Sequence, residues 1–119
     1  MRIGIDLDNT INYNENSKLF FRTLTLGLKD SSEIYIITNR DLSSYDSTVQ
    51  ELNSYGIHYD EVVITANKHK FILDNDINVY FDDTDEYFQK LPESVLVFKT
   101  RESGNFDFEE GKWFKIESS

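Results

Sequence analysis

Four aspartates at two places in the chain are the residues whose chemistry stands out first. Asp6 and Asp8 follow a short apolar run near the N-terminus, and Asp82 and Asp83 follow another such run. Carboxylates crowded into one site raise each other's pKa unless a cation, a proton or strong hydrogen-bond donors compensate them. Mg²⁺ takes one or two carboxylates in proteins and keeps several waters. The four acids therefore predict an oxygen-ligand Mg²⁺ site.

The same acids suit phosphoryl transfer when a hydroxyl and an ammonium group lie nearby. A carboxylate can attack phosphorus to give an aspartyl-phosphate, while a second acid protonates the leaving oxygen and later activates water. Hydroxyl and ammonium groups aimed at the phosphate oxygens stabilise the developing charge. Thr38 and Lys68 are residues of these types. Arg40 either reaches the substrate or is a solvated arginine at the surface, and the sequence does not favour one over the other.

Short apolar runs alternate with helix-like stretches, and this alternation predicts the elements that must position these residues. Strands are expected around Ile3 and Ile5 and at 33–37, 60–64, 77–81 and 95–98. Helices are expected at 17–28, 41–55 and 68–75, with a short one around 87–91 that Pro92 ends. The first helix is predicted to carry Leu19, Phe20, Leu24 and Leu28 at near-helical spacing, and the inner face of the second helix to be lined by Tyr45, Val49 and Leu52. Residues 11–14 are expected to be a polar turn.

Strands that alternate with helices imply parallel βαβ units and hence a three-layer α/β sandwich, with a mostly parallel, Rossmann-like sheet of five strands. Ligands bind such sheets outside the carboxyl ends of the strands. Asp6 and Asp8, Thr38, and Asp82 and Asp83 all follow strands directly. We therefore expect them to converge at one edge of the sheet although they are far apart in sequence.

Length and composition bound the class of protein. The 119 residues fit a single domain, 1–119, and residues 100–119 could form a small C-terminal hairpin from 106–110 and 113–116. The absence of cysteine excludes disulfides and thiolate sites. The net charge of −10 argues against binding a nucleic-acid backbone. Without a long apolar run or a signal-like N-terminus, a cytoplasmic location and no membrane partner are expected.

Four short motifs, in this order, resemble those of the haloacid dehalogenase-like phosphatase superfamily. They are Asp6-Leu-Asp-Asn-Thr, Ile-Ile-Thr38-Asn-Arg, Lys68 at the start of a helix, and Phe-Asp82-Asp83. Lys68 precedes Asp82 by 14 positions, as the family spacing requires. The resemblance covers roughly the first ninety residues, and its strength lies in the order of four motifs that are weak singly.

The resemblance implies a role for each matching residue. Asp6 would be the nucleophile, and Asp8 the general acid/base whose backbone carbonyl also reaches the metal. Thr38 and Lys68 would bind the transferring phosphoryl group, although Lys70 competes with Lys68 for that role. Asp82 and Asp83 would complete the Mg²⁺ site with Asp6.

The resemblance also implies a phosphatase without the inserted cap domain of larger family members, because the spacers 11–32 and 41–66 hold one helix and one helix plus a strand. A lid normally excludes water and selects the substrate. An open site predicts a bulky substrate or a second subunit of a homo-oligomer as its cover. The family's substrates include small molecules, nucleotides, sugar phosphates and phosphoproteins, and the sequence does not choose among them.

Other classes of protein carry similar sets of residues. A response-regulator receiver domain has similar parts, but it places its acid pair first and its lone phosphorylated Asp, Thr and Lys later, an order that this chain does not follow. A non-catalytic protein that keeps the metal site, or a phosphotransferase, would carry the same residues. Taken singly, the acids could be solvated groups at strand ends or near a helix N-terminus. Trp113 with Phe106, Phe108 and Phe114 predicts packing within the hairpin, or a partner site if exposed.

Overall fold

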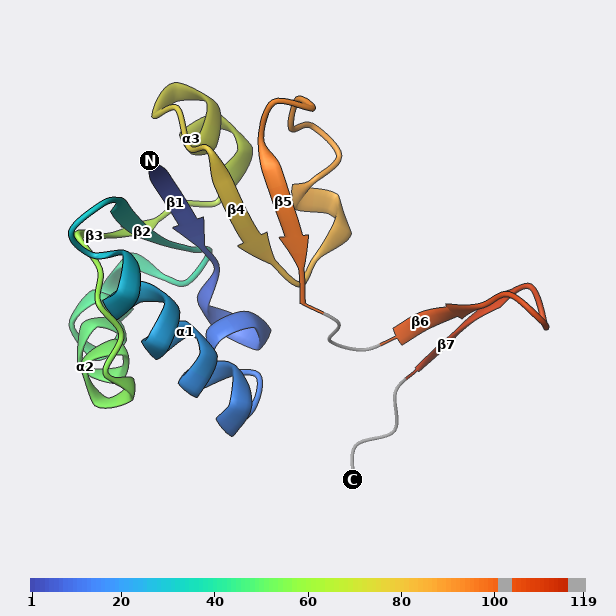
Figure 1. Ribbon diagram of the computed structural model, residues 1–119, viewed down its shortest axis with the longest axis horizontal. Coiled ribbons are helices and arrows are strands. Elements are labelled where there is room, and N and C mark those ends of the chain that lie inside the picture. Colours follow the sequence, from blue (N-terminus) through green and yellow to red (C-terminus); the bar gives the residue numbers. More distant parts are fainter. Residues whose placement is uncertain (101–103, 116–119) are drawn as a thin grey trace.

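A parallel sheet of five strands forms the centre of the molecule (Figure 1). The computed structural model describes residues 1–100 and 104–115. The strands are β1 (Arg2–Ile5), β2 (Glu33–Thr38), β3 (Glu61–Ile64), β4 (Val79–Asp82) and β5 (Leu96–Lys99). They pair in the order β3-β2-β1-β4-β5, and each pairing is parallel.

Helical segments cover both faces of this sheet and make the expected three-layer α/β sandwich. One face packs against α1 (Glu15–Leu28) and α2 (Tyr45–Tyr55), and the other against α3 (Lys68–Asp74) and the segment after β4. Three short turns complete the list: η1 (Leu7–Ile11), η2 (Leu42–Ser44) and η3 (Asp85–Tyr87). The predicted helix around 87–91 is thus a single 3₁₀ turn that begins two residues earlier.

The central strands are apolar because both of their faces are buried. Ile3 and Ile5 of β1 face the α1 and α2 layer, whereas Gly4 faces the opposite one. A Cβ atom at Gly4 would lie 2.8 Å from Ile37 Cδ1 and 3.1 Å from Tyr80 Cδ1. The absent side chain therefore lets two large residues of neighbouring strands pack over β1.

Helix α1 begins earlier than predicted and turns only part of its apolar set toward the sheet. Asn14 and Ser17 form a reciprocal capping box, so the helix begins at Glu15 rather than at residue 17. Phe21 is buried in the core and Leu24 and Leu28 pack against it, while Leu19 and Phe20 are about half exposed. Of the four apolar residues noted in the sequence, Leu24 and Leu28 thus face the core, and Leu19 and Phe20 do not.

Two neighbouring expectations also need correction. The four residues before α2 include a 3₁₀ turn, and Tyr45 is 46% exposed instead of lining the inner face, which is held by Leu52 and Thr48. Ile11 is fully buried in the core, so residues 11–14 are not simply a polar turn. Hydrophobic burial of Ile11 anchors the loop that carries the first acids.

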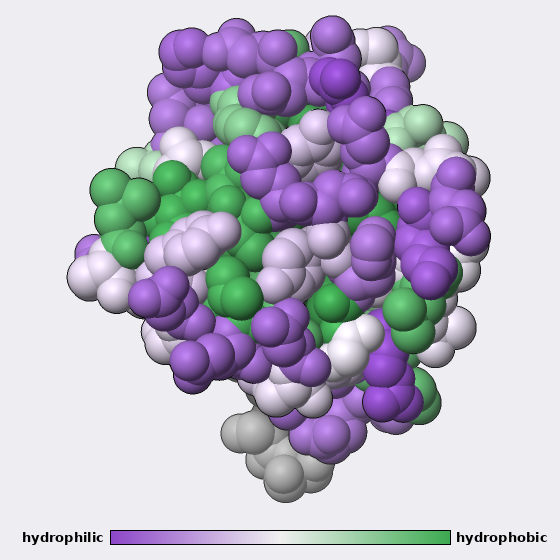
Figure 2. All heavy atoms as spheres, turned by 90° about the vertical axis from the view of Figure 1, so that its left-hand side faces the viewer, coloured by the Kyte–Doolittle hydropathy of each residue, from purple (hydrophilic) through white to green (hydrophobic). Residues whose placement is uncertain are grey.

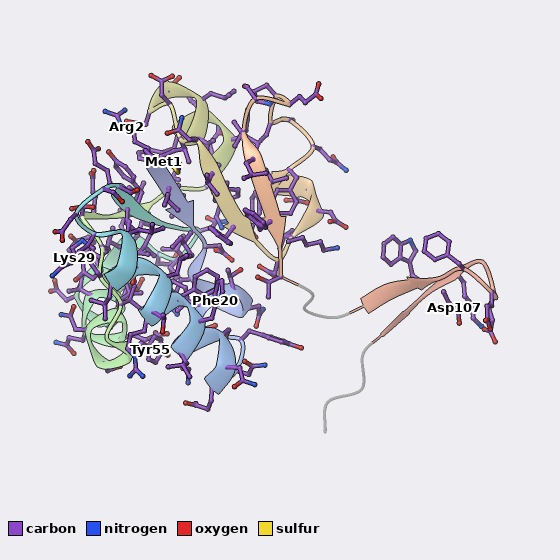
Figure 3. All side chains as sticks on the ribbon, viewed as in Figure 1. Met1, Arg2, Phe20, Lys29, Tyr55 and Asp107 are labelled. Carbon is purple, nitrogen blue, oxygen red and sulfur yellow. The ribbon has the colours of Figure 1, made fainter. Side chains whose placement is uncertain are left out.

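A two-stranded antiparallel hairpin follows the sheet, as the sequence predicts, but its first strand ends at Asp107 and residues 108–111 form the turn, whereas the predicted strand was 106–110. It consists of β6 (Gly104–Asp107) and β7 (Lys112–Lys115), and it extends away from the sheet, with Asp107 marking its far part (Figure 3). The side chains of Phe108 and Trp113 are 88% and 65% exposed. The predicted continuation to Ile116, and residues 101–103, lie outside the described residues.

The view from the side of α2 and β3 shows mostly hydrophilic side chains, with hydrophobic atoms gathered near the middle of that face (Figure 2). Among the described residues, each helix is too short or too polar to cross a membrane.

Candidate functional site

Asp6 lies at the carboxyl end of β1, where the chain leaves the sheet. The residue is buried, 4% exposed, and Thr10 Oγ1 donates a hydrogen bond to its Oδ2 at 3.1 Å. Thr10 reaches back because the chain turns sharply after Asp8, with Asn9 in the left-handed region at φ 60°. Asn tolerates that conformation better than most residues. The Asp-Asn-Thr sequence thus closes a tight loop over the first acid.

Lys68 joins the two strand ends that carry acids. Its Nζ lies 2.6 Å from Asp6 Oδ1 and 3.2 Å from Asp82 Oδ2, and the residue is 3% exposed. The ring of Tyr87 lies over the same ammonium, with its centroid 4.4 Å from Nζ. A buried ammonium is stable here because carboxylates and an aromatic face replace its water.

Asp82 ends β4 and is held on both of its oxygens. Its Oδ1 accepts the backbone N–H groups of Asp83 at 2.7 Å and Thr84 at 3.0 Å. Its Oδ2 accepts the hydroxyl of Tyr80 in addition to the Lys68 ammonium. These hydrogen bonds fix the orientation of the Asp82 carboxylate, as is usual for a metal ligand or a buried charge partner.

Three acids from two strand ends form a compact group. Asp6, Asp82 and Asp83 each offer an oxygen, and these atoms lie within 4.8 Å of one another. All three side chains are buried. An all-oxygen, acidic donor set of this kind fits a hard divalent cation such as Mg²⁺. The residues present thus suit the ion that the sequence predicts.

Electrostatics show that the acidic group is under-compensated by protein charges alone. Burial, followed by the nearby Asp82, raises the pKa of Asp6 to about 8, although Lys68 opposes the shift. Burial likewise raises the pKa of Asp82. Burial disfavours the charged form of Lys68, but Asp6 and Asp82 outweigh it and raise the pKa of the ammonium. One lysine among several carboxylates leaves room for more positive charge.

A small cavity of about 170 Å³ opens beside these groups at the carboxyl edge of the sheet. Thr38, which ends β2 and is 1% exposed, belongs to its lining. The residues that line it are Asp6, Asp8, Asn9, Thr38, Asn39, Lys68, Asp83, Thr84 and Tyr87. Five of the six predicted site residues thus meet at one cavity, and the sixth, Asp82, lies directly behind it through Lys68.

Asp8 lines the same cavity, but its carboxylate belongs to a different network from the buried acids. Arg40 donates two hydrogen bonds to it, from Nε at 3.0 Å and from Nη2 at 2.7 Å. These bonds are the main reason that the pKa of Asp8 is lowered. The side chains of the four predicted acids therefore do not form one group. Those of Asp6, Asp82 and Asp83 lie together, and that of Asp8 lies beside them, paired with Arg40.

Two lysines that the sequence could not separate differ sharply in position. Lys68 is buried between Asp6 and Asp82, whereas the side chain of Lys70 is 67% exposed and pairs with Asp74 on the surface of α3. The direction of the α3 axis decides this, because residues two apart on a helix point to different sides.

Several residues that contact the site were not predicted from the sequence. Thr10 stands within the first motif, but its bond to Asp6 depends on the turn at Asn9. Tyr80 lies in a predicted strand and Tyr87 in a predicted short helix, yet one donates to Asp82 and the other covers Lys68. A tyrosine two residues before a buried acid in a strand shares its face, and this periodicity could have indicated Tyr80.

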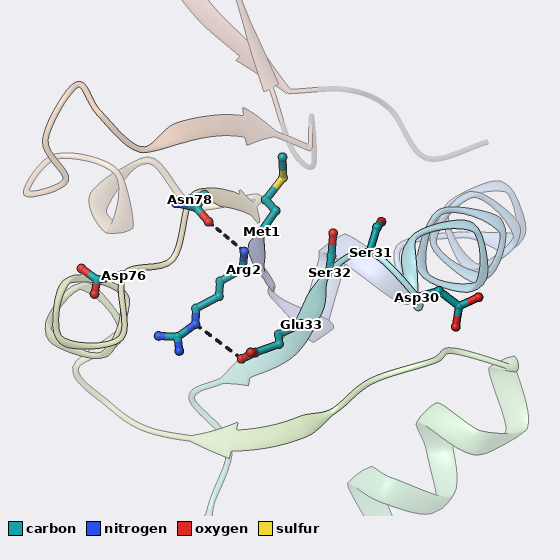
Figure 4. Close-up of a pocket in the computed structure, with 8 residues that line it drawn as sticks. All are labelled: Met1, Arg2, Asp30, Ser31, Ser32, Glu33, Asp76 and Asn78. Atoms are coloured by element: carbon teal, nitrogen blue, oxygen red, sulfur yellow. Dashed lines mark hydrogen bonds and ion pairs between the residues drawn. The ribbon is translucent and has the colours of Figure 1, made fainter.

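A larger hollow, of about 550 Å³, lies at the opposite end of the sheet, where Met1 and Arg2 mark the amino ends of the strands (Figure 3). Figure 4 shows its lining, in which Arg2 pairs with Glu33 and its backbone N–H bonds to Asn78. Arg2 and Glu33 form a solvent-exposed pair in this lining. Buried, converging charges therefore mark the candidate site better than the size of a hollow does.

No family model, curated protein or solved structure matches the chain.

Proposed function

We propose that this protein is a Mg²⁺-dependent phosphomonoester hydrolase of the haloacid dehalogenase-like type, which acts through an aspartyl-phosphate on Asp6. One observation carries the proposal: Asp6, Thr38, Lys68 and Asp83, from four separate segments, line one small cavity at the carboxyl edge of a parallel sheet. A carboxylate nucleophile, a hydroxyl, an ammonium and an acidic ligand are the groups that this chemistry needs.

The reaction would proceed in two half-reactions. An oxygen of Asp6 attacks phosphorus, the bond from phosphorus to the leaving oxygen breaks, and Asp8 donates a proton to that oxygen. Arg40 favours the ionised form of Asp8, so Asp8 would take up this proton beside the bound phosphate dianion, whose negative charge favours the protonated acid. Asp8 then takes a proton from water, whose oxygen attacks phosphorus and releases Asp6 and inorganic phosphate. Thr38 and Lys68 bind the non-bridging oxygens, where charge accumulates.

Asp6, Asp82 and Asp83 would hold the Mg²⁺ ion, together with the backbone carbonyl of Asp8. When bound, the ion neutralises charge on the phosphoryl group and favours the carboxylate form of Asp6. The clustering of three buried acids about one lysine supports the proposal, because a bound cation would favour the ionised form of each acid. Lys68 would then shift its contacts from the acids toward the phosphate.

The rest of the substrate has space beside the cavity. A second hollow of about 510 Å³ shares Lys68 and Tyr87 with it and is lined further by residues of the α3 start and of 86–90. Between β1 and β2 the described chain holds η1 and α1, and between β2 and β3 it holds η2 and α2, so neither segment contains a cap domain. A phosphorylated small molecule, nucleotide or phosphoprotein, or a second copy of the chain, would cover this open site.

The test is hydrolysis of p-nitrophenyl phosphate with Mg²⁺ and with EDTA, by wild type and by Asp6→Asn. We expect Mg²⁺-dependent turnover that falls by at least about 10³-fold in the variant, because the nucleophile is lost while the shape is kept. Asp8→Asn should lower kcat comparably, because the base that activates water in the second half-reaction is lost, whereas its kcat/KM on this aryl phosphate should change little. Asp74→Asn, which removes a surface acid of α3, is the matched control and should retain full activity.

Trapping the intermediate separates this mechanism from its alternatives. Beryllium fluoride with Mg²⁺ should mimic the phosphoryl group on Asp6 of the wild type and raise its melting temperature, and Asp6→Asn should not respond. Undiminished turnover in Asp6→Asn would refute the nucleophile assignment. Absence of both turnover and trapping would overturn the enzyme proposal in favour of a non-catalytic metal-binding protein.

A further inference from the structure

The carboxylate of Asp8 is held by a chain of side chains that reaches back to α2. Arg40 grips both oxygens of Asp8, through Nε at 3.0 Å and Nη2 at 2.7 Å. The third guanidinium nitrogen, Nη1, donates to Glu51 Oε1 at 3.0 Å and to Thr48 Oγ1 at 3.1 Å. The planar guanidinium thus links the acid loop to the helix, with each of its nitrogens in use.

Further hydrogen bonds tie the far end of this linkage to the rest of the fold. Asn12 Nδ2 donates to Asp8 Oδ1 and to Glu51 Oε2, both at 3.2 Å, so it runs parallel to Arg40. Tyr55 donates its hydroxyl to Glu51 Oε2 at 2.7 Å. Glu51 is therefore held from three sides and serves as a fixed anchor for Arg40.

This linkage matters because Asp8 would otherwise be a loosely held side chain. Its side chain is 50% exposed, whereas that of Arg40 is 22% exposed and that of Glu51 24%. A half-exposed carboxylate next to a left-handed Asn9 has several rotamers available. The two-pronged bond to Arg40 selects one of them, at the wall of the cavity that Asp6 also lines.

We propose that Arg40 is a positioning residue: braced by Glu51 and Thr48 on α2, it orients the Asp8 carboxyl group toward the leaving oxygen of the substrate. The proposal rests on the phosphatase function above and assigns Arg40 no contact with the phosphate. In the first half-reaction the proton passes from Asp8 to the leaving oxygen as the phosphorus–oxygen bond breaks. Correct orientation of the acid speeds that transfer and leaves the attack by Asp6 unaffected.

Substrates whose leaving groups differ in basicity distinguish positioning of the acid from binding of the substrate. A p-nitrophenolate leaves without needing a proton, whereas an alkoxide depends on one. The value of kcat/KM reports steps up to the cleavage of the substrate's phosphorus–oxygen bond. We therefore compare kcat/KM for p-nitrophenyl phosphate and for an alkyl phosphate such as glycerol 2-phosphate, in wild type, Arg40→Ala, Arg40→Lys and Glu51→Gln.

For Arg40→Ala we expect kcat/KM to fall about 30-fold or more on the alkyl phosphate and less than about 3-fold on the aryl phosphate. Asp8→Asn should show the same asymmetry. Arg40→Lys and Glu51→Gln should lie between wild type and Arg40→Ala, because one restores a single charge and the other loosens the anchor. Arg22→Ala removes an exposed arginine of α1 and should match wild type on both substrates.

Equal losses on the two substrates would overturn the proposal, because a substrate-binding or purely structural arginine does not distinguish leaving groups. Should Arg40→Ala not fold, Arg40→Lys and Glu51→Gln decide by the same ratio. A wild type that hydrolyses neither substrate would refute the proposed function, whereas active wild type with symmetric losses in the variants would refute the role of Arg40 alone.

Discussion

At the scale of single residues, the site is defined by an imbalance of buried charge. Lys68 is the ammonium that meets two strand-end carboxylates, while Asp83 adds a third acid within ligand distance. Breaking one partner of such a cluster is costly, because the remaining charges stay buried without compensation. The geometry therefore ties stability and chemistry to the same few atoms.

Separate substitution of Lys68 and of Lys70 by alanine tests which lysine binds the phosphoryl group. Lys68→Ala should lower turnover of the aryl phosphate by at least about 10²-fold, because a buried, preorganised cation at the transferring group is lost. Lys70→Ala should change turnover less than about 2-fold, because its exposed pair with Asp74 contributes little. Melting curves of both variants show whether each is folded. Similar losses in the two variants would argue against the assignment of Lys68.

The raised pKa of Asp6 predicts a pH dependence of stability. In the metal-free protein the group titrates at about 8, compared with 3.8 for an ordinary aspartate. Between these values the folded state holds a proton that the unfolded state has lost, so the free energy of unfolding falls as pH rises from about 4 to about 8. Asp6→Asn carries no such proton and should lack this contribution.

The measurement is the melting temperature of wild type and Asp6→Asn in EDTA at several pH values between 4.5 and 8.5. The melting temperature of wild type minus that of Asp6→Asn should decrease as pH rises, and titrating groups that do not interact with Asp6 cancel in that difference. Parallel profiles would show that the Asp6 carboxyl group is not shifted in the folded protein.

At the scale of elements, α2 both covers the sheet and anchors Arg40, so its end is a sensitive position. Gly56 stops the helix with φ +73°, and a Cβ there would lie 2.8 Å from Arg22 Cδ. Gly56→Ala should therefore destabilise the protein by about 1–2 kcal/mol. Gly27, inside α1, has normal φ and no atom within 4 Å of an added Cβ, so Gly27→Ala should stabilise by about 0.5–1 kcal/mol.

Urea unfolding of the two glycine variants measures both effects in one experiment. Opposite signs are the expected result, because the same substitution meets a left-handed backbone at one site and a regular helix at the other. A neutral or stabilising Gly56→Ala would mean that the end of α2 relaxes without cost.

The elements themselves were largely predictable from the sequence, because periodicity and terminators act locally. All five strands were placed within two residues, and Gly56 correctly marked the end of α2. The apolar spacing of α1 correctly included Leu24 and Leu28 but also the exposed Leu19 and Phe20, because spacing alone does not show which side of a helix the sheet covers. The bond from Thr10 to Asp6 was likewise not predicted from the pattern, because it depends on the left-handed backbone at Asn9.

At the scale of the whole molecule, topology explains why part of the site was predictable. Parallel strands bring their carboxyl ends to one edge, so Asp6, Thr38 and Asp82 converge by a rule of the fold. The partnership of Asp8 with Arg40 and Glu51 was not predictable, because it joins two loops and one face of α2 through side-chain bonds that no spacing encodes. The topology of the fold thus determines where the strand ends lie, and specific hydrogen bonds determine which partner each acid has.

Because the protein carries a net charge of −10, a test of Mg²⁺ binding needs a control for general salt effects. Mg²⁺ bound to the folded protein alone should stabilise it by mass action, by about 2.7 kcal/mol at one hundred times its dissociation constant. Any salt also screens self-repulsion in so acidic a protein. Melting temperatures are therefore compared in MgCl₂ and in NaCl of equal ionic strength, for wild type and Asp83→Asn.

Wild type should melt at a higher temperature in MgCl₂ than in the matched NaCl solution, because a specific site gains from the ion beyond screening. Asp83→Asn should lose most of that difference, since it removes one carboxylate of the buried group while keeping its shape. Asp74→Asn, which lowers the surface charge equally, should keep the full difference. Equal melting temperatures of wild type in the two salts would show that Mg²⁺ acts on this protein through screening alone, and the buried acids would then be charge partners of Lys68 rather than metal ligands.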